Sequence, residues 1–312
     1  MSSGYGYGKV ILFGEHFVVY GLPAIVSAIG SRTIAYVQKL TSPDLQLIDD
    51  RQEVPGYKKN KKEEQDKSIA NVLNYCKIDP KKYGINVRFS GDLVAASGIG
   101  ASAASCAALS RALNQEFSLG FDDEKINLSA FEGEKGYHGN PSGIDNTAAT
   151  YGGLIWFKRN LNGGPNIIDK LNMTAPVNIV IANTGLTAST AKVVADVRKQ
   201  KDKDPEKFEK IFNDYFDIVS KARKALIRNQ LDEIGDLMNK NQNLLRQINV
   251  SSPELEKMIK IALDYGAPGA KLTGTGRGGN MFALTPGKAL QETISNIFEK
   301  QGYMVWKTTI GI

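Results

Sequence analysis

The chain has 312 residues, enough for two domains of ordinary size or one large domain. Apolar residues make up 42% and charged residues 23%, which is typical of a soluble globular protein, and no apolar run approaches the roughly 18 residues of a membrane span. The net charge of +6 would suit anionic ligands. However, the charge run at 58–67 mixes both signs without interleaved aromatic residues, which argues against nucleic-acid binding.

The termini and the cysteines bear on the compartment. The N-terminus lacks the charged-then-apolar pattern of a secretory signal, and the last three residues are not the peroxisomal Ser-Lys-Leu signal. Cys76 and Cys106 show no metal-binding spacing, so we expect two buried or half-buried thiols in a reducing compartment. We therefore expect a cytoplasmic protein without membrane or nucleic-acid partners, although the sequence does not exclude an organelle. It does not distinguish a monomer from a homodimer.

The first half of the chain mixes strand and helix patterns. Residues 9–21 contain two short apolar stretches divided by a Gly-Glu-His turn, and residues 32–40 alternate like a half-buried strand. Residues 84–91 predict another strand, which leads through a Gly/Ser/Ala segment into an Ala-rich helix at 106–117. An acidic first turn and helical spacing predict a further helix over 122–136.

The second half begins with helices and ends with strands. Residues 177–185 have the pattern of a fully apolar strand, and long helical patterns then occupy 188–263. Strand patterns return at 270–284 and 303–311, with a helix between them. This change of pattern predicts two α+β domains that meet near residue 175, covering 1–175 and 176–312.

The stretch "HGNPSGIDNTAATYGG" at 138–153 raises a chemical question. It holds one of only two histidines, a Gly-Asn-Pro-Ser-Gly turn and a single acid, Asp145. Glycine and proline make such a stretch a poor helix and a poor strand. Taken alone, Asp145 is a turn-capping residue, so a catalytic interpretation requires partners from elsewhere in the chain.

Two N-terminal segments could supply those partners. In Gly8–Gly21, the Glu15-His16 pair lies on a tight turn, although such a pair is often a surface feature. In Ala96–Ser105, glycines would let the backbone approach a phosphate, and the free amides of a helix start would favour the anion. No Gly-Lys-Ser/Thr follows, so this is not the Walker pattern, and a helix packed through small side chains is the alternative.

A third segment lies near the C-terminus. Lys271–Leu284 has four glycines in six positions between two strand-like pieces. A plain hairpin does not need so many, so the backbone is expected to approach a ligand or another loop closely. Arg277 in this loop could contact phosphate or could be solvated.

The order and spacing of these motifs resemble the GHMP small-molecule kinase superfamily, most closely the mevalonate kinases, from Lys9 to about Ala283. The resemblance implies a two-domain α+β fold, with an N-terminal α+β domain, a ferredoxin-like C-terminal domain and the active site in the cleft between them. It implies ATP- and Mg²⁺-dependent phosphorylation of the primary hydroxyl of (R)-mevalonate, giving 5-phosphomevalonate for isoprenoid and sterol precursor biosynthesis. The small-molecule substrate would be mevalonate and the co-substrate ATP.

The resemblance also implies roles for individual residues. Asp145 matches the general base that takes the proton of the substrate hydroxyl, and Lys9 matches the cation that would keep it ionised. Ser102 and Glu134 match the magnesium ligands, an oxygen-only set that Mg²⁺ prefers. The remaining implied residues bind substrate (Glu15, His16 and Thr190) or ATP phosphates (Ala96, Ser97, Gly98, Ile99, Gly100, Ala101, Ser102, Gly274 and Gly276).

The chain departs from the family pattern at five positions. Ala101 replaces a serine of the phosphate loop, Thr275 and Arg277 stand in Gly-rich text, Asn280 replaces a small or thiol residue, and Tyr7 replaces a proline. These departures affect the loops expected to hold nucleotide and leave the base, the lysine and the metal ligands intact.

Rival functions remain on the same fold. A galactokinase-like chain would follow Gly-Glu-His with an acidic sugar-binding segment, and here the apolar "FVVYG" follows. A homoserine-kinase-like chain does not carry this aspartate in this setting. A catalytically silent sensor tends to lose the base or the metal ligand, and both are present here.

Overall fold

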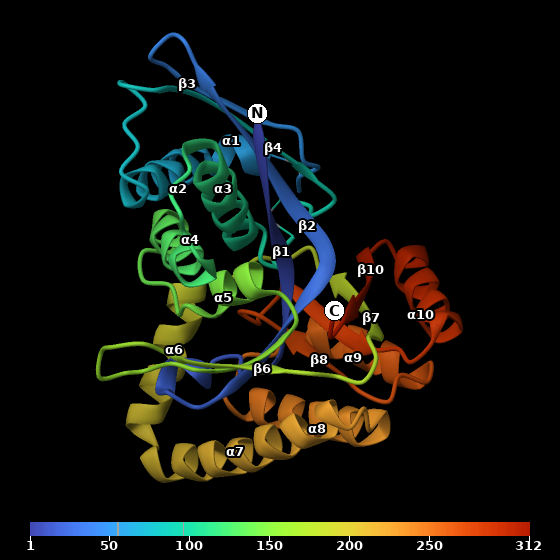
Figure 1. The fold of residues 1–312 in the computed structure, drawn as a ribbon. Helices are drawn as coiled ribbons and strands as arrows, with labels where there is room; N and C mark the ends of the chain where they lie inside the picture. Colours follow the sequence, from blue (N-terminus) through green and yellow to red (C-terminus); the bar gives the residue numbers. More distant parts are fainter. Residues whose placement is uncertain (55, 96) are drawn as a thin grey trace. The chain divides into compact units, whose positions relative to one another are not determined.

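The computed structural model describes residues 1–54, 56–95 and 97–312 and consists of helices and strands throughout (Figure 1). The chain forms two compact units, one made of Met1–Lys9 and Ala28–Gly152 and the other of Val10–Ser27 and Gly153–Ile312. The sequence predicts a single division near residue 175 instead. The difference arises because residues 24–27 pair with residues 154–157, which brings an N-terminal segment into the second unit.

Four strands contribute to unit 1, among the described residues. β2 (Ala24–Leu40) runs antiparallel to β4 (Gly84–Gly91) from Thr33–Gly91 to Leu40–Gly84, and β3 (Leu45–Asp49) pairs with β4 in parallel. β1 (Ser2–Phe13) also pairs with β2. β2 alternates buried and exposed side chains where it pairs with β4, as the sequence predicts for a half-buried strand.

The helices of unit 1 pack chiefly on one another. They are α1 (Tyr57–Asn60), α2 (Lys62–Tyr75), α3 (Ala101–Phe117), α4 (Asp123–His138) and α5 (Ile144–Tyr151). α4 packs against α2, α3 and α5. Most of the Ala-rich α3 is buried, because alanine and serine side chains let neighbouring elements approach closely. Cys76 and Cys106 are buried thiols, as predicted.

Unit 2 is built around a four-stranded antiparallel sheet in the order β10-β7-β9-β8. The strands are β7 (Val177–Asn183), β8 (Ala270–Thr273), β9 (Asn280–Leu284) and β10 (Met304–Ile310). In chain order this is the 4-1-3-2 arrangement of a ferredoxin-like βαββαβ domain, with helices in both crossovers, so the implied C-terminal fold is confirmed. The two central strands, β7 and β9, are mostly apolar and buried, and the edge strand β8 is buried as well, since helices pack on the sheet.

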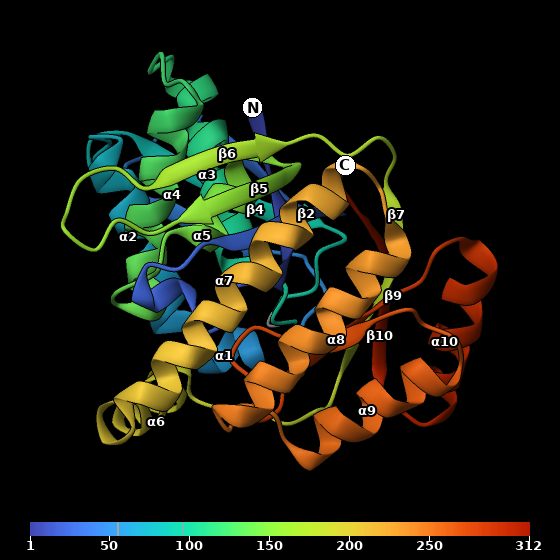
Figure 2. The same cartoon turned by 90° about the horizontal axis from the view of Figure 1, so that it is seen from below.

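Five helices belong to this unit, among the described residues: α6 (Thr190–Lys203), α7 (Pro205–Ile227), α8 (Leu231–Gln247), α9 (Pro253–Asp264) and α10 (Lys288–Lys300). α7 and α8 run side by side, α8 and α9 pack on β8, and α10 packs on β7 and β10 (Figure 2). The 3-10 turn η1 (Val18–Tyr20) and the strands β5 (Leu154–Lys158) and β6 (Ile167–Leu171) complete the unit. No helix in the described part of the chain is long and apolar enough to cross a membrane.

The prediction that residues 138–153 form neither helix nor strand is wrong. α4 continues to His138, and α5 occupies Ile144–Tyr151. The glycines and the proline lie between the two helices, where Gly139 ends one and Gly143, with φ 89°, precedes the other. Asp145 is therefore in the first turn of a helix and not on a free turn.

Candidate active site

Lys9 and Asp145 form an ion pair in unit 1. Lys9 lies on β1 and is only 6% exposed, and its Nζ is 3.1 Å from Oδ1 of Asp145. The backbone N–H of Lys9 donates to the carbonyl of Ile99 at 2.8 Å, so the same residue also holds the predicted phosphate loop. The carboxylate of Asp145 sits in the first turn of α5, where the helix dipole favours a negative charge. The structure thus brings the predicted base, its lysine and the loop together.

The phosphate loop leads directly into α3. Gly100 is the N-cap in the left-handed conformation, with φ 85°, and no side chain caps the helix. The amides of the first turn are thereby left to an anion, which is the geometry expected of a phosphate site. The hydroxyl of Ser97 donates to the carbonyl of Val94, so it serves the loop itself. Ala96, also predicted to bind phosphate, lies outside the described residues.

Glu134 is a buried acid, and one oxygen of its side chain makes no hydrogen bond to the described residues. Its side chain is 1% exposed, and Oε1 has no hydrogen-bond partner among the described residues. Burial and then the nearby charge of Asp145 raise the pKa of Glu134 to about 8, while a hydrogen bond from Ser102 and the charge of Lys9 oppose the shift. Nε2 of His138 lies 3.9 Å from the other oxygen. An unsatisfied buried carboxylate beside a serine hydroxyl suits a bound cation.

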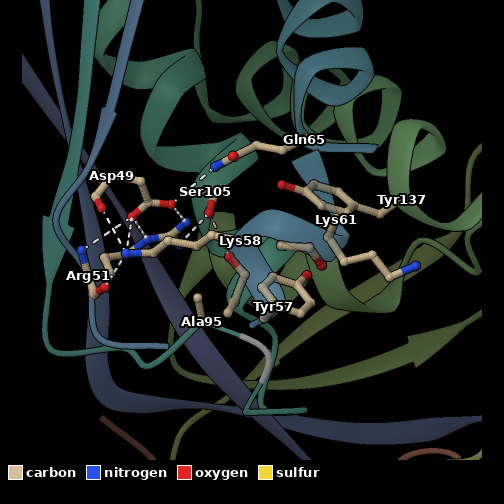
Figure 3. A pocket seen from close by; sticks show the side chains of 11 residues that line it. Asp49, Arg51, Tyr57, Lys58, Lys61, Gln65, Ala95, Ser105 and Tyr137 are labelled. Carbon is tan, nitrogen blue, oxygen red and sulfur yellow. Dashed lines mark hydrogen bonds and ion pairs between the residues drawn. The ribbon is translucent and has the colours of Figure 1, made fainter. Parts of the chain in front are cut away.

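A polar cluster braces the start of α3 beside a small cavity (Figure 3). Arg51 makes two hydrogen bonds to the carboxylate of Asp49, at 2.9 and 2.7 Å. It also donates to Oγ of Ser105 at 2.6 Å, and Ser105 in turn donates to the carbonyl of Ala101. The cavity beside the cluster has a volume of about 10 Å³, the size of one water molecule. The sequence analysis missed this cluster, because no motif marks Arg51.

In unit 2, Glu15 pairs with Lys271. The two side chains have no exposed surface, and Nζ of Lys271 lies 2.5 Å from Oε1 of Glu15. Burial lowers the pKa of Lys271, and the carboxylate of Glu15 opposes that shift. No motif in the sequence gives Lys271 a role. The structure shows that it needs a partner, because β8 is buried along its whole length and a buried lysine is almost always paired.

His16 and Thr190, both predicted to bind substrate, meet at the Gly-rich loop. Nε2 of His16 donates to the carbonyl of Thr275 at 2.7 Å, and the hydroxyls of Thr190 and Thr275 are 2.6 Å apart. His16 is buried and has a left-handed backbone, with φ 63°, and its burial lowers the pKa of the imidazole. Thr190 is the first residue of α6 and is exposed.

The glycines of this loop differ in what surrounds the position of the missing side chain. A Cβ on Gly276 would lie 2.2 Å from the carbonyl oxygen of Val250, so its close approach is to another segment of the protein. A Cβ on Gly274 would meet nothing within 4 Å, which leaves this position open to a ligand. The sequence predicts either phosphate contact or solvation for Arg277. In the structure Arg277 pairs with Asp196, with Nη1 and Oδ2 2.6 Å apart.

The implied site residues therefore fall into two groups, one in each compact unit. Unit 1 holds the residues implied to act as the base, its lysine, the metal ligands and the phosphate loop, and unit 2 holds those implied to bind substrate together with the Gly-rich loop. In residues, these are Lys9, Ser97, Gly98, Ile99, Gly100, Ala101, Ser102, Glu134 and Asp145 in the first group, and Glu15, His16, Thr190, Gly274 and Gly276 in the second.

Comparison with known proteins identifies the class. The family model described as GHMP kinases N terminal domain matches residues 67–153, and that described as GHMP kinases C terminal matches residues 222–303. The fold and the matched regions define a GHMP small-molecule kinase.

Individual relatives narrow the class. A mevalonate kinase from Pyrococcus horikoshii is 35% identical over 300 residues, covering 90% of this chain and 87% of the relative. One from Archaeoglobus fulgidus is 32% identical and covers 96% of this chain and 97% of the relative. The crystal structure of L. major mevalonate kinase in complex with R-mevalonate matches with a TM-score of 0.93 and 44% identity, covering 99% of this chain and 96% of that chain. The chain belongs to the mevalonate kinase family.

Proposed function

We propose that this protein is a mevalonate kinase, which transfers the γ-phosphoryl group of ATP to the primary hydroxyl of (R)-mevalonate. The observation that carries the proposal is the Lys9–Asp145 pair, whose lysine also bonds the phosphate loop through its backbone. A base, a cation and a loop of free helix amides are what phosphoryl transfer to an alcohol requires. The relatives named mevalonate kinase support the choice of alcohol.

In the proposed mechanism, the carboxylate of Asp145 accepts the proton of the primary hydroxyl as its oxygen bonds to the γ-phosphorus. ADP leaves with the electrons of the broken P–O bond. Lys9, 3.1 Å from Oδ1, stabilises the carboxylate and fixes its direction. The amides at the start of α3 stabilise phosphate charge without needing to reorganise during the reaction.

Glu134 and Ser102 would hold magnesium. The unpartnered Oε1 of Glu134 and the neighbouring serine hydroxyl fit a hard cation that prefers oxygen. The described residues contain no cluster of three or more His, Cys, Asp or Glu side chains able to hold a metal, so the phosphates of ATP would complete the ligand set. When bound, magnesium neutralises phosphate charge.

Substrate binding is proposed for His16, Thr190 and Glu15. His16 and Thr190 both bond to Thr275, which supports a shared site at the Gly-rich loop. Glu15 is buried against Lys271, so we propose that it acts mainly by holding the turn that carries His16. Gly274, whose missing side chain faces open space, would let the loop approach the nucleotide. The buried free thiols Cys76 and Cys106 support the expected reducing compartment, the cytoplasm.

The test is ADP release with ATP and magnesium across mevalonate, phosphomevalonate, galactose and homoserine. We expect mevalonate to give the highest kcat/KM by several orders of magnitude over galactose, because the apolar segment after Gly-Glu-His offers no polar partners, and each unpaired sugar hydroxyl would cost roughly 1–3 kcal/mol. Equal or better turnover of galactose or homoserine would contradict the substrate assignment, and no turnover of any alcohol would favour a silent sensor.

A further inference from the structure

The two residues by which the Gly-rich loop departs from the family pattern both bond to α6. The hydroxyl of Thr275 lies 2.6 Å from that of Thr190, at the first residue of the helix. Arg277 donates to Asp196, almost two turns further along, and to the backbone carbonyl of Asn249. A glycine at position 275 would have no hydroxyl to offer α6.

Thr275 differs from Arg277 because it makes two contacts with residues that we propose bind substrate. Its backbone carbonyl, which any residue at this position would provide, accepts the Nε2–H of His16, and its side-chain hydroxyl pairs with that of Thr190. A carbonyl can only accept, so this bond fixes which nitrogen of the imidazole carries hydrogen in the neutral ring. The hydroxyl pair likewise uses one hydrogen-bonding role of Thr190 and leaves the other for a ligand.

The loop around Thr275 is fixed by backbone hydrogen bonds and close packing, so it can hold a side chain in a defined position. The backbone N–H of Arg277 donates to the carbonyl of Val250 at 2.7 Å, and that of Gly279 donates to the carbonyl of Leu186 at 2.8 Å. Gly276 packs against Val250 too closely to admit a side chain. A hydroxyl carried on such a loop has a defined position, which is what a group that orients other side chains needs.

We propose that Thr275 is a positioning residue whose side chain sets specificity for the alcohol substrate by fixing the Thr190 hydroxyl on the loop whose backbone carbonyl holds the His16 ring. The assignment of the substrate as mevalonate rests on the proposed function. Thr275 itself needs no contact with ATP for this role. Its loss should therefore weaken substrate binding and leave nucleotide binding unchanged.

The experiment compares Thr275→Val, which keeps the shape and removes the hydroxyl, with Thr275→Ser, which keeps the hydroxyl. For Thr275→Val we expect the KM for mevalonate to rise roughly 3- to 15-fold, the worth of one hydrogen bond, with the KM for ATP within about twofold of the parent. Thr275→Ser should restore most of the loss. In a cycle with Thr190→Val, the double variant should be little worse than either single variant.

Arg277→Gln is the matched control, because it removes the other bond between the loop and α6. It should lower Tm more than Thr275→Val and leave the KM for mevalonate unchanged. A merely structural Thr275 would behave like Arg277, or would change both KM values equally, and either result overturns the proposal. If the parent does not turn over mevalonate, the proposed function fails, and the same variants are measured with the best alcohol of the substrate panel.

Discussion

Glu15 and Lys271 form an ion pair with no exposed side-chain surface, at 2.5 Å between Oε1 and Nζ. The pair joins the turn after β1 to the strand that precedes the Gly-rich loop. Taking two charges out of water is costly, and their attraction offsets the cost only while both are present. The pair is therefore better understood as fixing the substrate turn than as a source of stability.

We expect Lys271→Met to destabilise the protein by about 3–5 kcal/mol, because it leaves the carboxylate of Glu15 buried without its cation. Adding Glu15→Gln should recover part of that loss, since the double variant buries no unpaired charge. Urea unfolding of the parent, the two single variants and the double variant measures both effects. A double variant that equals the sum of the single variants would show that the two side chains do not interact.

Asp145→Asn should keep the fold and ATP binding and lower kcat by roughly 10²–10⁴, the usual contribution of a positioned base. Asparagine keeps the size of the side chain and cannot take the proton of the substrate hydroxyl. Single-turnover phosphorylation, with ATP binding measured separately, checks this. An asparagine variant with near-parental turnover would mean that Asp145 only stabilises the first turn of α5.

The sequence predicted most elements because their hydrophobic periods agree with their environment. The strand predicted over 84–91 has the bounds of β4, since its alternation matches a sheet with one buried face. α5 was missed because the glycines and the proline before Asp145 outweighed the short helix-forming stretch after it. The hydrophobic periodicity of the sequence cannot show that these glycines and this proline lie between two helices.

The residues of the candidate site are predicted by the family resemblance and not by local rules of residue type and spacing. No local rule joins Lys9 to Asp145, because their contact depends on the packing of β1 beside α5's first turn. The Arg51 cluster and the partner of Glu15 were missed for the same reason, since a buried polar group can be recognised only when its neighbours are known. The sequence shows that Thr275 departs from the Gly-rich family pattern, and only the structure shows that its hydroxyl contacts that of Thr190.

The raised pKa of Glu134 predicts a specific dependence of stability on pH. The folded protein holds this proton up to about pH 8, whereas the unfolded chain releases it near the ordinary value of 4.5. The contribution is thus complete below about pH 4.5 and is lost as the pH rises to about 8, by up to roughly 1.4 kcal/mol per pH unit. Glu134→Gln has no such proton, so its stability relative to the parent should increase across this range.

Unfolding free energies of both proteins from pH 4.5 to 8 provide the measurement. Glu132→Gln is the control, because Glu132 is a half-buried acid on the same helix that is paired with Lys135. The control should track the parent apart from a small constant offset. If Glu134→Gln also tracks the parent at every pH, Glu134 does not hold its proton in the folded state.

Magnesium dependence gives a separate test of Glu134 and Ser102. Either Glu134→Gln or Ser102→Ala should raise the magnesium concentration needed for half-maximal rate, since each removes an oxygen ligand. The glutamine variant should be affected more, because a glutamine cannot lose a proton to give the cation a negatively charged ligand. Titrations at fixed ATP measure this, and a Glu134→Gln curve that overlays the parental one would exclude the acid from the metal site.

Gly100→Ala should lower kcat by displacing the side chain of Lys9. A Cβ at position 100 would lie 2.7 Å from Cγ of Lys9, so the lysine side chain must shift, and we expect its ion pair with Asp145 to be disturbed. Gly100 also has φ 85°, which costs any other residue roughly 1–2 kcal/mol. Gly120→Ala is the matched control, because Gly120 has φ 68° and its Cβ would meet nothing within 4 Å. Both variants should lose similar backbone stability, and only Gly100→Ala should lose kcat, by at least tenfold. Equal kcat in the two variants would show that the side chain of Lys9 tolerates displacement and that the loop does not position it.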